Sequence, residues 1–262
     1  FLGPEEGDMA SGEFGPGRMA EPEDIADAIA RILPSAQGVS LVGRHVLITS
    51  GPTYEPIDPV RYIANRSSGK QGHALARAAK DMGARVTLIS GPTHLPDIPG
   101  VMTVKVETAA DMLDAALGAL PADIAICAAA VADWRAATQA AEKLKKEEGQ
   151  TALNLALARN PDILATLAAP GARRPALVIG FAAETETIIT HAQEKLSRKG
   201  ADWIVANDVS PDTGIMGGDR TEVHLVSAAG VEDWPAMGKD EMAVKLLARA
   251  AEALHTVQLA AE

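Results

Sequence analysis

From residue 44 onward, short apolar runs alternate with stretches of helical periodicity, and this alternation limits the possible folds more than any other feature. Apolar runs predict six strands, at residues 45–51, 85–91, 101–106, 123–131, 176–184 and 202–208. Between them, apolar residues at helical spacing predict helices at residues 71–82, 108–120 and 185–199. Nearly continuous apolar strands that alternate with helices are typical of a parallel sheet covered on both faces.

The last part of the chain does not follow this alternation of strands and helices. Residues 221–234 predict an antiparallel ribbon, and residues 239–254 predict a closing helix. The expected fold is therefore α/β: a Rossmann-like, doubly wound, mostly parallel sheet with helices on both faces and a C-terminal antiparallel ribbon.

The first 43 residues differ in composition. Residues 1–20 hold five glycines and two prolines, which predicts a loop. Residues 21–33 predict an amphipathic helix, and residues 34–43 a linker of small and turn-forming residues. Because the chain begins at Phe1, we expect a piece of a longer protein whose main domain here spans residues 44–262.

Charge and cysteine content exclude several classes of protein. A net charge of −11 argues against general nucleic-acid binding, which needs a basic surface. Cys127 is the single cysteine, so a disulfide within the chain is excluded and a reducing cytoplasm is expected. Six histidines lie without metal-ligand spacing, and no apolar run approaches the ~18 residues of a membrane span.

In doubly wound sheets ligands bind where the strands end, so the loops after the strands are the candidate sites. The first loop, residues 50–72, is long enough to suggest function rather than mere connection. Just before a predicted helix it offers hydroxyls, backbone N–H groups and a cation to a phosphate. These come from Ser67, Ser68, Gly69 and Lys70.

This loop matches no common nucleotide motif. A Walker A loop would need glycine at position 64 and serine or threonine at 71, but the chain has Ala64 and Gln71. A GxGxxG motif is also absent, and neither Tyr54 nor Tyr62 is followed by a lysine four residues on. Both absences weaken a nicotinamide-dependent interpretation.

The fourth strand runs into small residues that would let a planar ring approach the backbone, and Asp133 could orient a base, a ribose or a metal. The plainer alternative is tight packing, with Cys127 as a small core residue rather than a nucleophile. Further on, Lys143, Lys145 and Lys146 form either a solvated charge run or a mobile loop that closes over a polyphosphate.

Residues 160–163 predict a helix start, with Asn160 as the cap, Pro161 in the first turn and Asp162 facing the helix dipole. Such a start also directs N–H groups at a ligand. Phe181 lies toward the end of the predicted fifth strand, where a base could stack. Lys195 and Lys199 lie four residues apart on one helix face, although lysines near a helix end are also favoured by its dipole.

Several segments in this order, ITSGPTYEPIDPVRYIANRSSGKQG, AAAVADWRA, EKLKK, NPDI, GFAAET and ANDVS, closely resemble phosphopantothenate–cysteine ligase of the CTP-dependent type. This family forms the synthetase half of the bifunctional bacterial coenzyme A biosynthesis proteins. The resemblance covers about residues 44–257.

The resemblance implies a two-step ligation assisted by Mg²⁺, whose ligands in this chain it does not identify. The carboxylate of 4′-phosphopantothenate attacks the α-phosphorus of CTP, and L-cysteine then attacks the resulting acyl-cytidylate. By family position Asn65 and Arg61 handle the phosphopantothenate and the acyl-cytidylate, and Lys143 is the essential lysine of the mobile loop. The CTP contacts carry over to Cys127, Ala128, Ala129, Asp133, Lys143, Pro161, Asp162, Ile163, Leu164, Phe181, Lys195 and Lys199.

The N-terminal segment resembles the tail of the partner flavin-dependent decarboxylase, so we expect residues 1–33 to be a remnant of that domain. FMN would belong only to its missing part. The family's proton-donor cysteine is replaced by Ser11, so decarboxylation is not expected. The family also implies a homodimer of the ligase domain and a larger assembly with the full decarboxylase. We expect the dimer interface at the ribbon near residues 223–226.

Two other functions stay open on the sequence. One is a non-catalytic nucleotide-binding or assembly module whose lysine loop is merely solvated. The other is a nicotinamide-dependent oxidoreductase. The preference for CTP over ATP also stays open.

Overall fold

A computed structural model describes residues 3–8, 14–22, 24–25, 40–145, 151–184, 187–208 and 220–259. The chain divides into two compact units, residues 1–40 and residues 41–262. Among the described residues, no helix is long and apolar enough to cross a membrane.

The first unit contains a pair of antiparallel strands, β1 (Glu5–Asp8) and β2 (Phe14–Arg18). The prediction of a loop over residues 1–20 is therefore wrong for these two segments. Four of their nine residues are glycine or proline, and they lack the alternation of polar and apolar residues that predicts a strand. Residues 22, 24 and 25 are helical, whereas most of the predicted helix and linker, and Ser11, lie outside the described residues.

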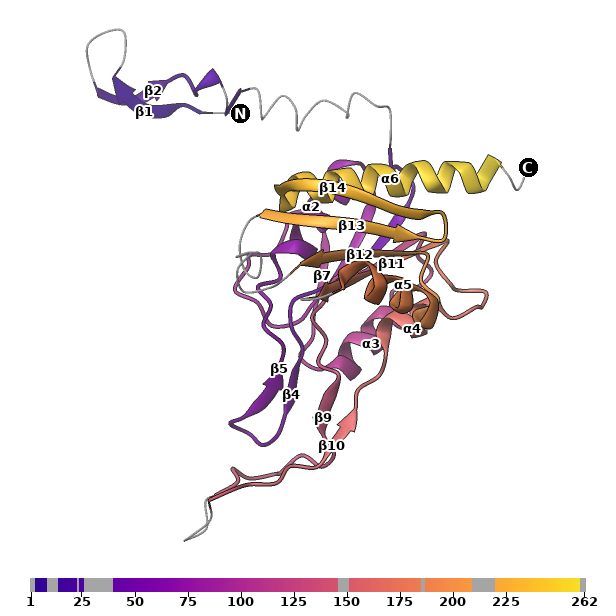
Figure 1. The fold of residues 1–262 in the computed structure, drawn as a ribbon. Helices are drawn as coiled ribbons and strands as arrows, with labels where there is room; N and C mark the ends of the chain where they lie inside the picture. The colour runs from indigo at the N-terminus through magenta and orange to yellow at the C-terminus, as the bar shows by residue number, and fades with distance from the viewer. Residues whose placement is uncertain are drawn as a thin grey trace. The chain divides into compact units, whose positions relative to one another are not determined.

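The second unit is built on one sheet of eight strands, in the order β14-β13-β12-β11-β8-β3-β6-β7 (Figure 1). The neighbours from β12 to β7 are parallel, and β13 and β14 continue the sheet in antiparallel fashion. The expected mostly parallel sheet with a C-terminal antiparallel ribbon is confirmed. Its strands are β3 (His45–Ser50), β6 (Arg85–Ser90), β7 (Met102–Lys105), β8 (Ile124–Cys127), β11 (Leu177–Glu184), β12 (Trp203–Asp208), β13 (Arg220–Ser227) and β14 (Gly230–Gly238).

Helices cover both faces of this sheet (Figure 1). On one face α2 (Lys70–Asp81) lies against β3 and β6 and packs along α6 (Lys239–Leu259). The other face carries α3 (Ala109–Gly118), α4 (Ile163–Ala168) and α5 (Ile188–Lys199).

Alternate residues of each strand supply the two cores. Leu47 of β3 and Ile89 of β6 pack with Met112 of α3 and Ile163 of α4, and all four are buried. The side chains between them in β3, including Val46 and Ile48, are buried as well, because a strand with helices on both faces has no solvent side.

Local signals in the sequence set several helix ends. The Thr108 side chain accepts a hydrogen bond from the Asp111 N–H and forms a capping box at the start of α3. Gly200 ends α5 in the left-handed conformation, with φ of 68°, as its position predicts.

The central strand β8 ends at Cys127, four residues before the predicted end. Residues 128–131 leave the sheet because they pair with the loop that follows β3. Ala130 forms a parallel bridge with Pro52, and the Ala132 N–H donates to Thr53 Oγ1 at 3.0 Å.

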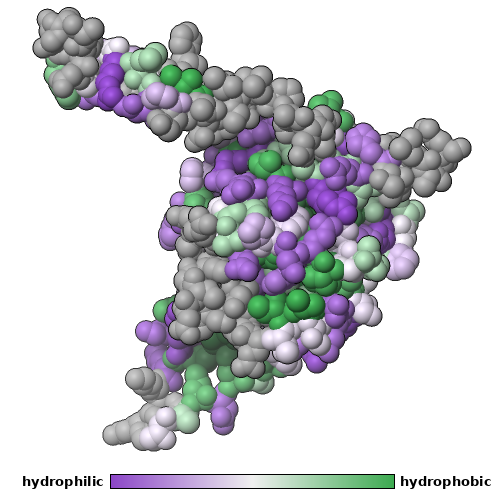
Figure 2. Space-filling view, turned by 45° about the horizontal axis from the view of Figure 1, so that its top comes forward, coloured by the Kyte–Doolittle hydropathy of each residue, from purple (hydrophilic) through white to green (hydrophobic). Residues whose placement is uncertain are grey.

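Two short antiparallel arms extend from the loops that follow the central strands β3 and β8 (Figure 1). The first pairs β4 (Tyr54–Pro56) with β5 (Tyr62–Ala64), and the second pairs β9 (Trp134–Ala136) with β10 (Leu157–Arg159). Each of these strands is three residues long, which is too short to show periodicity, so the sequence did not predict them. Figure 2 shows green, hydrophobic residues gathering toward the lower end of this unit, where Figure 1 places the arms.

In chain order, the six parallel strands follow the arrangement 3-2-1-4-5-6 of a doubly wound nucleotide-binding fold. The chain moves outward in one direction from β3 and in the other from β8. The crevice between the loops that leave these two strands is therefore the expected ligand site.

Candidate functional site

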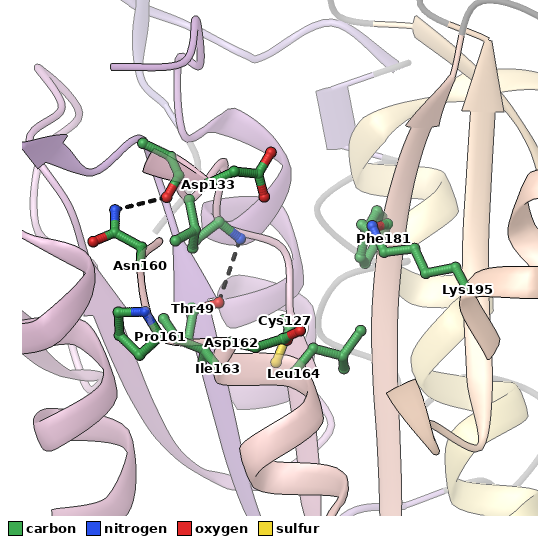
Figure 3. Close-up of a pocket in the computed structure, with 13 residues that line it drawn as sticks. Thr49, Cys127, Asp133, Asn160, Pro161, Asp162, Ile163, Leu164, Phe181 and Lys195 are labelled. Atoms are coloured by element: carbon green, nitrogen blue, oxygen red, sulfur yellow. Dashed lines mark hydrogen bonds between the residues drawn. The ribbon is translucent and has the colours of Figure 1, made fainter. Parts of the chain in front are cut away.

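A pocket opens at this switch point, at the carboxyl ends of β3 and β8 (Figure 3). One wall carries the ends of both strands and the segment before α4, and the opposite wall carries Phe181 of β11 and Lys195 of α5. Its volume is about 170 Å³. The lining residues are Thr49, Cys127, Ala129, Val131, Ala132, Asp133, Asn160, Pro161, Asp162, Ile163, Leu164, Phe181 and Lys195.

Thr49, the penultimate residue of β3, fixes the backbone beside the pocket. Its carbonyl accepts the Ala128 N–H at 3.2 Å, and its Oγ1 accepts the Ala129 N–H at 3.3 Å. The side chains along this edge are small, so a planar ligand group can lie close to the main chain.

Asn160 does not cap α4, contrary to the sequence prediction. Asp162 is the cap, because its carboxylate accepts the Ala165 N–H at 3.0 Å. The Asn160 side chain instead donates to the Ala132 carbonyl at 2.7 Å, and its backbone N–H donates to the Asp133 carbonyl at 2.9 Å. Asn160 thus ties the segment before α4 to the segment that carries Asp133.

The two lysines of α5 both face the pocket region. Lys195 Nζ donates to the Phe181 carbonyl at 2.8 Å, and Lys199 forms an ion pair with Asp162. Burial opposes ionisation of Asp162, but the hydrogen bonds from Lys199 and from the Ala165 N–H outweigh it and lower the pKa of the carboxyl. Asp162 is therefore a carboxylate at neutral pH, and it holds one end of α5 against the start of α4.

Cys127 is a poor nucleophile in this position. Burial raises the pKa of its thiol to about 12, so the thiolate is scarce at neutral pH. The prediction that this residue lines a pocket rather than reacts is consistent with that environment.

Three residues expected to act on the substrate lie outside the pocket lining but are attached to neighbouring segments. Asn65 Nδ2 donates to the carbonyl of the pocket residue Val131 at 2.9 Å. Arg61 Nη2 donates to the carbonyl of Leu144 at 2.9 Å, directly after Lys143 in the chain. Lys143 itself is exposed.

The predicted phosphate cradle lies at the start of α2 and does not line this pocket. Gly69 adopts the left-handed conformation there, with φ of 75°. The Ser67 hydroxyl accepts the Gly69 N–H at 3.3 Å, and the Ser68 hydroxyl accepts the Lys70 N–H at 3.5 Å. Its role with phosphate stays a prediction.

Sequence reasoning assigned no ligand role to four lining residues: Thr49, Val131, Ala132 and Asn160. Thr49 carries a hydroxyl at the penultimate position of a buried strand, and that signal could have singled it out. Val131 and Ala132 follow a loop that bends back toward residues 52 and 53, and Asn160 is bonded to the carbonyls of Ala132 and Asp133, so none of the three carries a local signal.

Carboxylates in the pocket suit magnesium better than zinc. The described residues contain no cluster of three or more histidine, cysteine, aspartate or glutamate side chains that could hold a metal by themselves. Mg²⁺ is commonly held by one or two carboxylates together with substrate phosphates, and Asp133 and Asp162 both line the pocket. The residues present therefore fit a magnesium ion that arrives with a polyphosphate.

Comparison with known proteins identifies the family. The model of the "DNA/pantothenate metabolism flavoprotein C-terminal domain" family matches residues 41–254. The coenzyme A biosynthesis bifunctional protein CoaBC of Escherichia coli (strain K12) is 46% identical over 249 residues, which is 94% of this chain and 60% of that protein. Its counterpart in Vibrio cholerae serotype O1 is 44% identical over 242 residues, 92% of this chain and 60% of that protein. The chain thus spans about 60% of the length of these relatives.

Solved structures agree with this assignment. The crystal structure of the C-terminal domain of a coenzyme A biosynthesis bifunctional protein CoaBC aligns with a TM-score of 0.69 at 37% identity, covering 84% of this chain and 100% of that one. A Cab2 mutant H337A in complex with phosphopantothenate-cysteine has the same fold, with a TM-score of 0.63 at 18% identity, covering 90% of this chain and 94% of that one. The chain therefore belongs to the family of the DNA/pantothenate metabolism flavoprotein C-terminal domain.

Proposed function

We propose that this chain is a phosphopantothenate–cysteine ligase. It joins 4′-phosphopantothenate and L-cysteine in coenzyme A biosynthesis and uses CTP as the co-substrate. Residues 44–262 would be the ligase domain, residues 34–43 a linker, and residues 1–33 the end of a preceding decarboxylase domain whose other part binds FMN.

The observation that carries this proposal is the convergence of separate motifs on one pocket. Residues from four segments far apart in the sequence, around Cys127, Pro161, Phe181 and Lys195, line the same cavity at the switch point. Each was singled out beforehand as a CTP contact by its resemblance to the ligase family. The relatives' names, which refer to coenzyme A biosynthesis, support the same reaction.

The geometry suits a ligation that needs no protein nucleophile. The phosphopantothenate carboxylate attacks the α-phosphorus of CTP, and pyrophosphate leaves with the electrons of the broken P–O bond. The cysteine amine then attacks the carbonyl of the acyl-cytidylate, loses a proton, and CMP leaves. Lysine and arginine stabilise the charge that develops on the phosphates, while the fixed segments hold the reactants in line.

Residues of both pocket walls contribute to the proposed ligation. Phe181 offers a ring face to the base, and the small residues at Cys127 and Ala129 let the base approach the main chain. Lys195 and Lys199 lie where the phosphates would extend. A bound Mg²⁺ neutralises phosphate charge, and Asp133 and Asp162 are the residues that would hold it.

We also propose that the ligase domain works as a homodimer in the cytoplasm, joined through the two arms rather than the ribbon. The ribbon strand β13 lies between β12 and β14, and Val223, Leu225 and Val226 are buried within the chain. We therefore prefer the arms to the interface expected near residues 223–226. The arms instead carry exposed large hydrophobic residues. These residues are Val60, Tyr62, Trp134, Leu153 and Leu157.

The function is tested by replacing Lys143 with glutamine and measuring pyrophosphate release from CTP and 4′-phosphopantothenate. Loss of one cation that stabilises a transferring phosphate is expected to lower kcat by roughly 10²- to 10³-fold. Asn65→Asp should also lower turnover, because its carboxylate replaces the amide that donates to the Val131 carbonyl.

Lys145→Gln is the matched control, since Lys145 is an exposed lysine two residues away on the same segment. It should keep wild-type turnover. Unchanged turnover in both Lys143→Gln and Asn65→Asp would contradict the site and favour a nucleotide-binding module. The same assay with ATP in place of CTP measures the base preference.

A further inference from the structure

Leu144, the residue after Lys143, is held at both of its backbone polar groups. Its N–H donates to Asp58 Oδ2 at 3.1 Å, and its carbonyl accepts a hydrogen bond from Arg61 Nη2 at 2.9 Å. A second contact lies nearby, where the Ala140 N–H donates to the Ile57 carbonyl at 2.9 Å. The segment before and after Lys143 is therefore fastened to the turn at residues 57–61.

Asp58 is the centre of this arrangement. Its side chain is fully buried, and both carboxylate oxygens are occupied. Oδ1 accepts the N–H groups of Val60 and Arg61, each at 2.9 Å, and Oδ2 accepts Arg61 Nε at 3.0 Å as well as the Leu144 N–H. One oxygen thus shapes the turn, and the other holds Arg61 and the lysine segment at the same time.

Arg61 has donor capacity left after these bonds. Its side chain is 42% exposed, and among the described residues its Nη1 group makes no hydrogen bond. The ammonium group of Lys143 likewise has no partner among the described residues and lies on an exposed side chain. The bonds to the Asp58 carboxylate and the Leu144 carbonyl use only the Nε and Nη2 groups of the guanidinium. Both cations can therefore meet an anionic substrate.

We propose that Asp58 is a positioning residue of the ligation: through Leu144 it fixes Lys143 beside Arg61, so that both cations act on one bound substrate. This role rests on the proposed function. In this proposal the segment around Lys143 is not freely mobile, because it is anchored through the backbone N–H and carbonyl of Leu144.

The chemistry of the carboxylate explains why aspartate is needed. The Arg61 guanidinium holds the pKa of Asp58 well below its usual range, so the group is ionised at working pH. An asparagine has one acceptor oxygen and one NH₂ donor. At position 58, its single oxygen could accept hydrogen bonds either from the turn N–H groups or from Arg61 and Leu144. Its NH₂ group would then face the remaining N–H donors, which it cannot accept from.

Two variants test the role. Asp58→Asn should disconnect the segment, and Leu144→Pro removes the N–H donor while leaving Asp58 and Arg61 intact. In both, we expect faster amide hydrogen exchange in residues 141–145. We also expect kcat for pyrophosphate release to fall roughly 10- to 100-fold, since small misplacements of catalytic groups have effects of this size, with KM for CTP changed less.

Asp202→Asn is the matched control. Asp202 also accepts hydrogen bonds from an arginine, Arg174, and from a backbone N–H, that of Val178 at 2.7 Å. It directly precedes β12, however, and so lies at the amino end of that strand, whereas the pocket lies at the carboxyl ends of the strands. It should leave exchange in residues 141–145 and kcat unchanged.

Wild-type kcat, or wild-type exchange in residues 141–145, in Asp58→Asn and Leu144→Pro would overturn the positioning role. If the unsubstituted chain released no pyrophosphate, the proposed function would fail. The exchange experiment would still report on the anchor, so the two failures are distinguishable.

Discussion

At the scale of single residues, Cys127 shows how position controls reactivity. It is the single cysteine of the chain and lines the pocket, yet burial raises its pKa to about 12. Alkylation proceeds through the thiolate, so the reaction with iodoacetamide at pH 7.5 should be roughly a thousandfold slower than that of a free cysteine.

The same thiol reports on nucleotide binding. Because Cys127 lies in the proposed CTP pocket, CTP with Mg²⁺ should slow its alkylation further, measured by mass spectrometry of the intact chain. NADPH at equal concentration is the control and should give no protection. Equal rates with and without CTP would place the nucleotide elsewhere, and protection by NADPH alone would favour the oxidoreductase.

Asn160 and Asp162 show what a local motif leaves undecided. Either residue type can cap a helix, so the sequence NPDI is compatible with both as the first cap. Tertiary contacts made the choice, because the Asn160 Nδ2 group donates to the Ala132 carbonyl and its Oδ1, the atom that would cap the helix, accepts a hydrogen bond from Arg135 Nη1 at 3.3 Å.

At the scale of elements, the start of α2 is fastened to the end of β3 by a buried histidine. His73 Nδ1 lies 3.3 Å from Ser50 Oγ and 3.1 Å from the Gly69 carbonyl, and the ring is buried. Burial lowers the pKa of His73, and Arg77 adds to the effect, whereas the Gly69 carbonyl and Asp97 oppose it. The folded protein therefore favours the neutral ring.

This predicts a loss of stability on mild acidification. The folded pKa lies below the unfolded value of about 6.5, so the unfolded chain binds the proton first as the pH falls. The contribution of His73 to stability is thus complete above about pH 6.5 and is lost as the pH falls toward and through the folded pKa.

Thermal unfolding at pH 7 and pH 5 measures the effect. The wild-type chain should lose more stability between these pH values than His73→Gln does, with exposed His94→Gln as the control that behaves like wild type. An equal loss in His73→Gln and wild type would assign the pH dependence to other groups.

Elements differed in how far the sequence predicted them. Buried strands such as β3 and β6, and the capped helix α3, follow from apolar runs and from the Thr108 cap, signals that lie within the element itself. The arms do not, because β4, β5, β9 and β10 are three residues long and exist only as pairs. Strand pairing between such short segments, separated by residues 57–61 in the first arm and by residues 137–156 in the second, leaves no periodicity in the sequence.

At the scale of the whole molecule, the exposed hydrophobic residues of the arms predict an association of two copies. Replacing Leu157, which is 45% exposed on β10, with aspartate should shift the chain from dimer to monomer, because a charge would be buried at the interface. Analytical ultracentrifugation at micromolar concentration measures the change.

Met102→Asp is the control for this prediction. Met102 is 61% exposed on the sheet-edge strand β7, away from the arms, so the substitution should leave the dimer intact. A monomeric wild-type chain, or a Leu157→Asp variant that stays dimeric, would contradict the proposed interface.

By itself, the sequence determined the layered α/β class and the strands of the main sheet, because apolar runs and helix caps are properties of neighbouring residues. Its ordered motifs also marked the residues that we propose to bind CTP. Only the tertiary structure decided which of those residues meet. The strand order placed the loops after β3 and β8 together, Asn160 left its capping role, and Asp58 reached across 86 residues to Leu144. Such contacts form because buried polar groups need hydrogen-bond partners, and which partners lie within reach depends on how the chain packs.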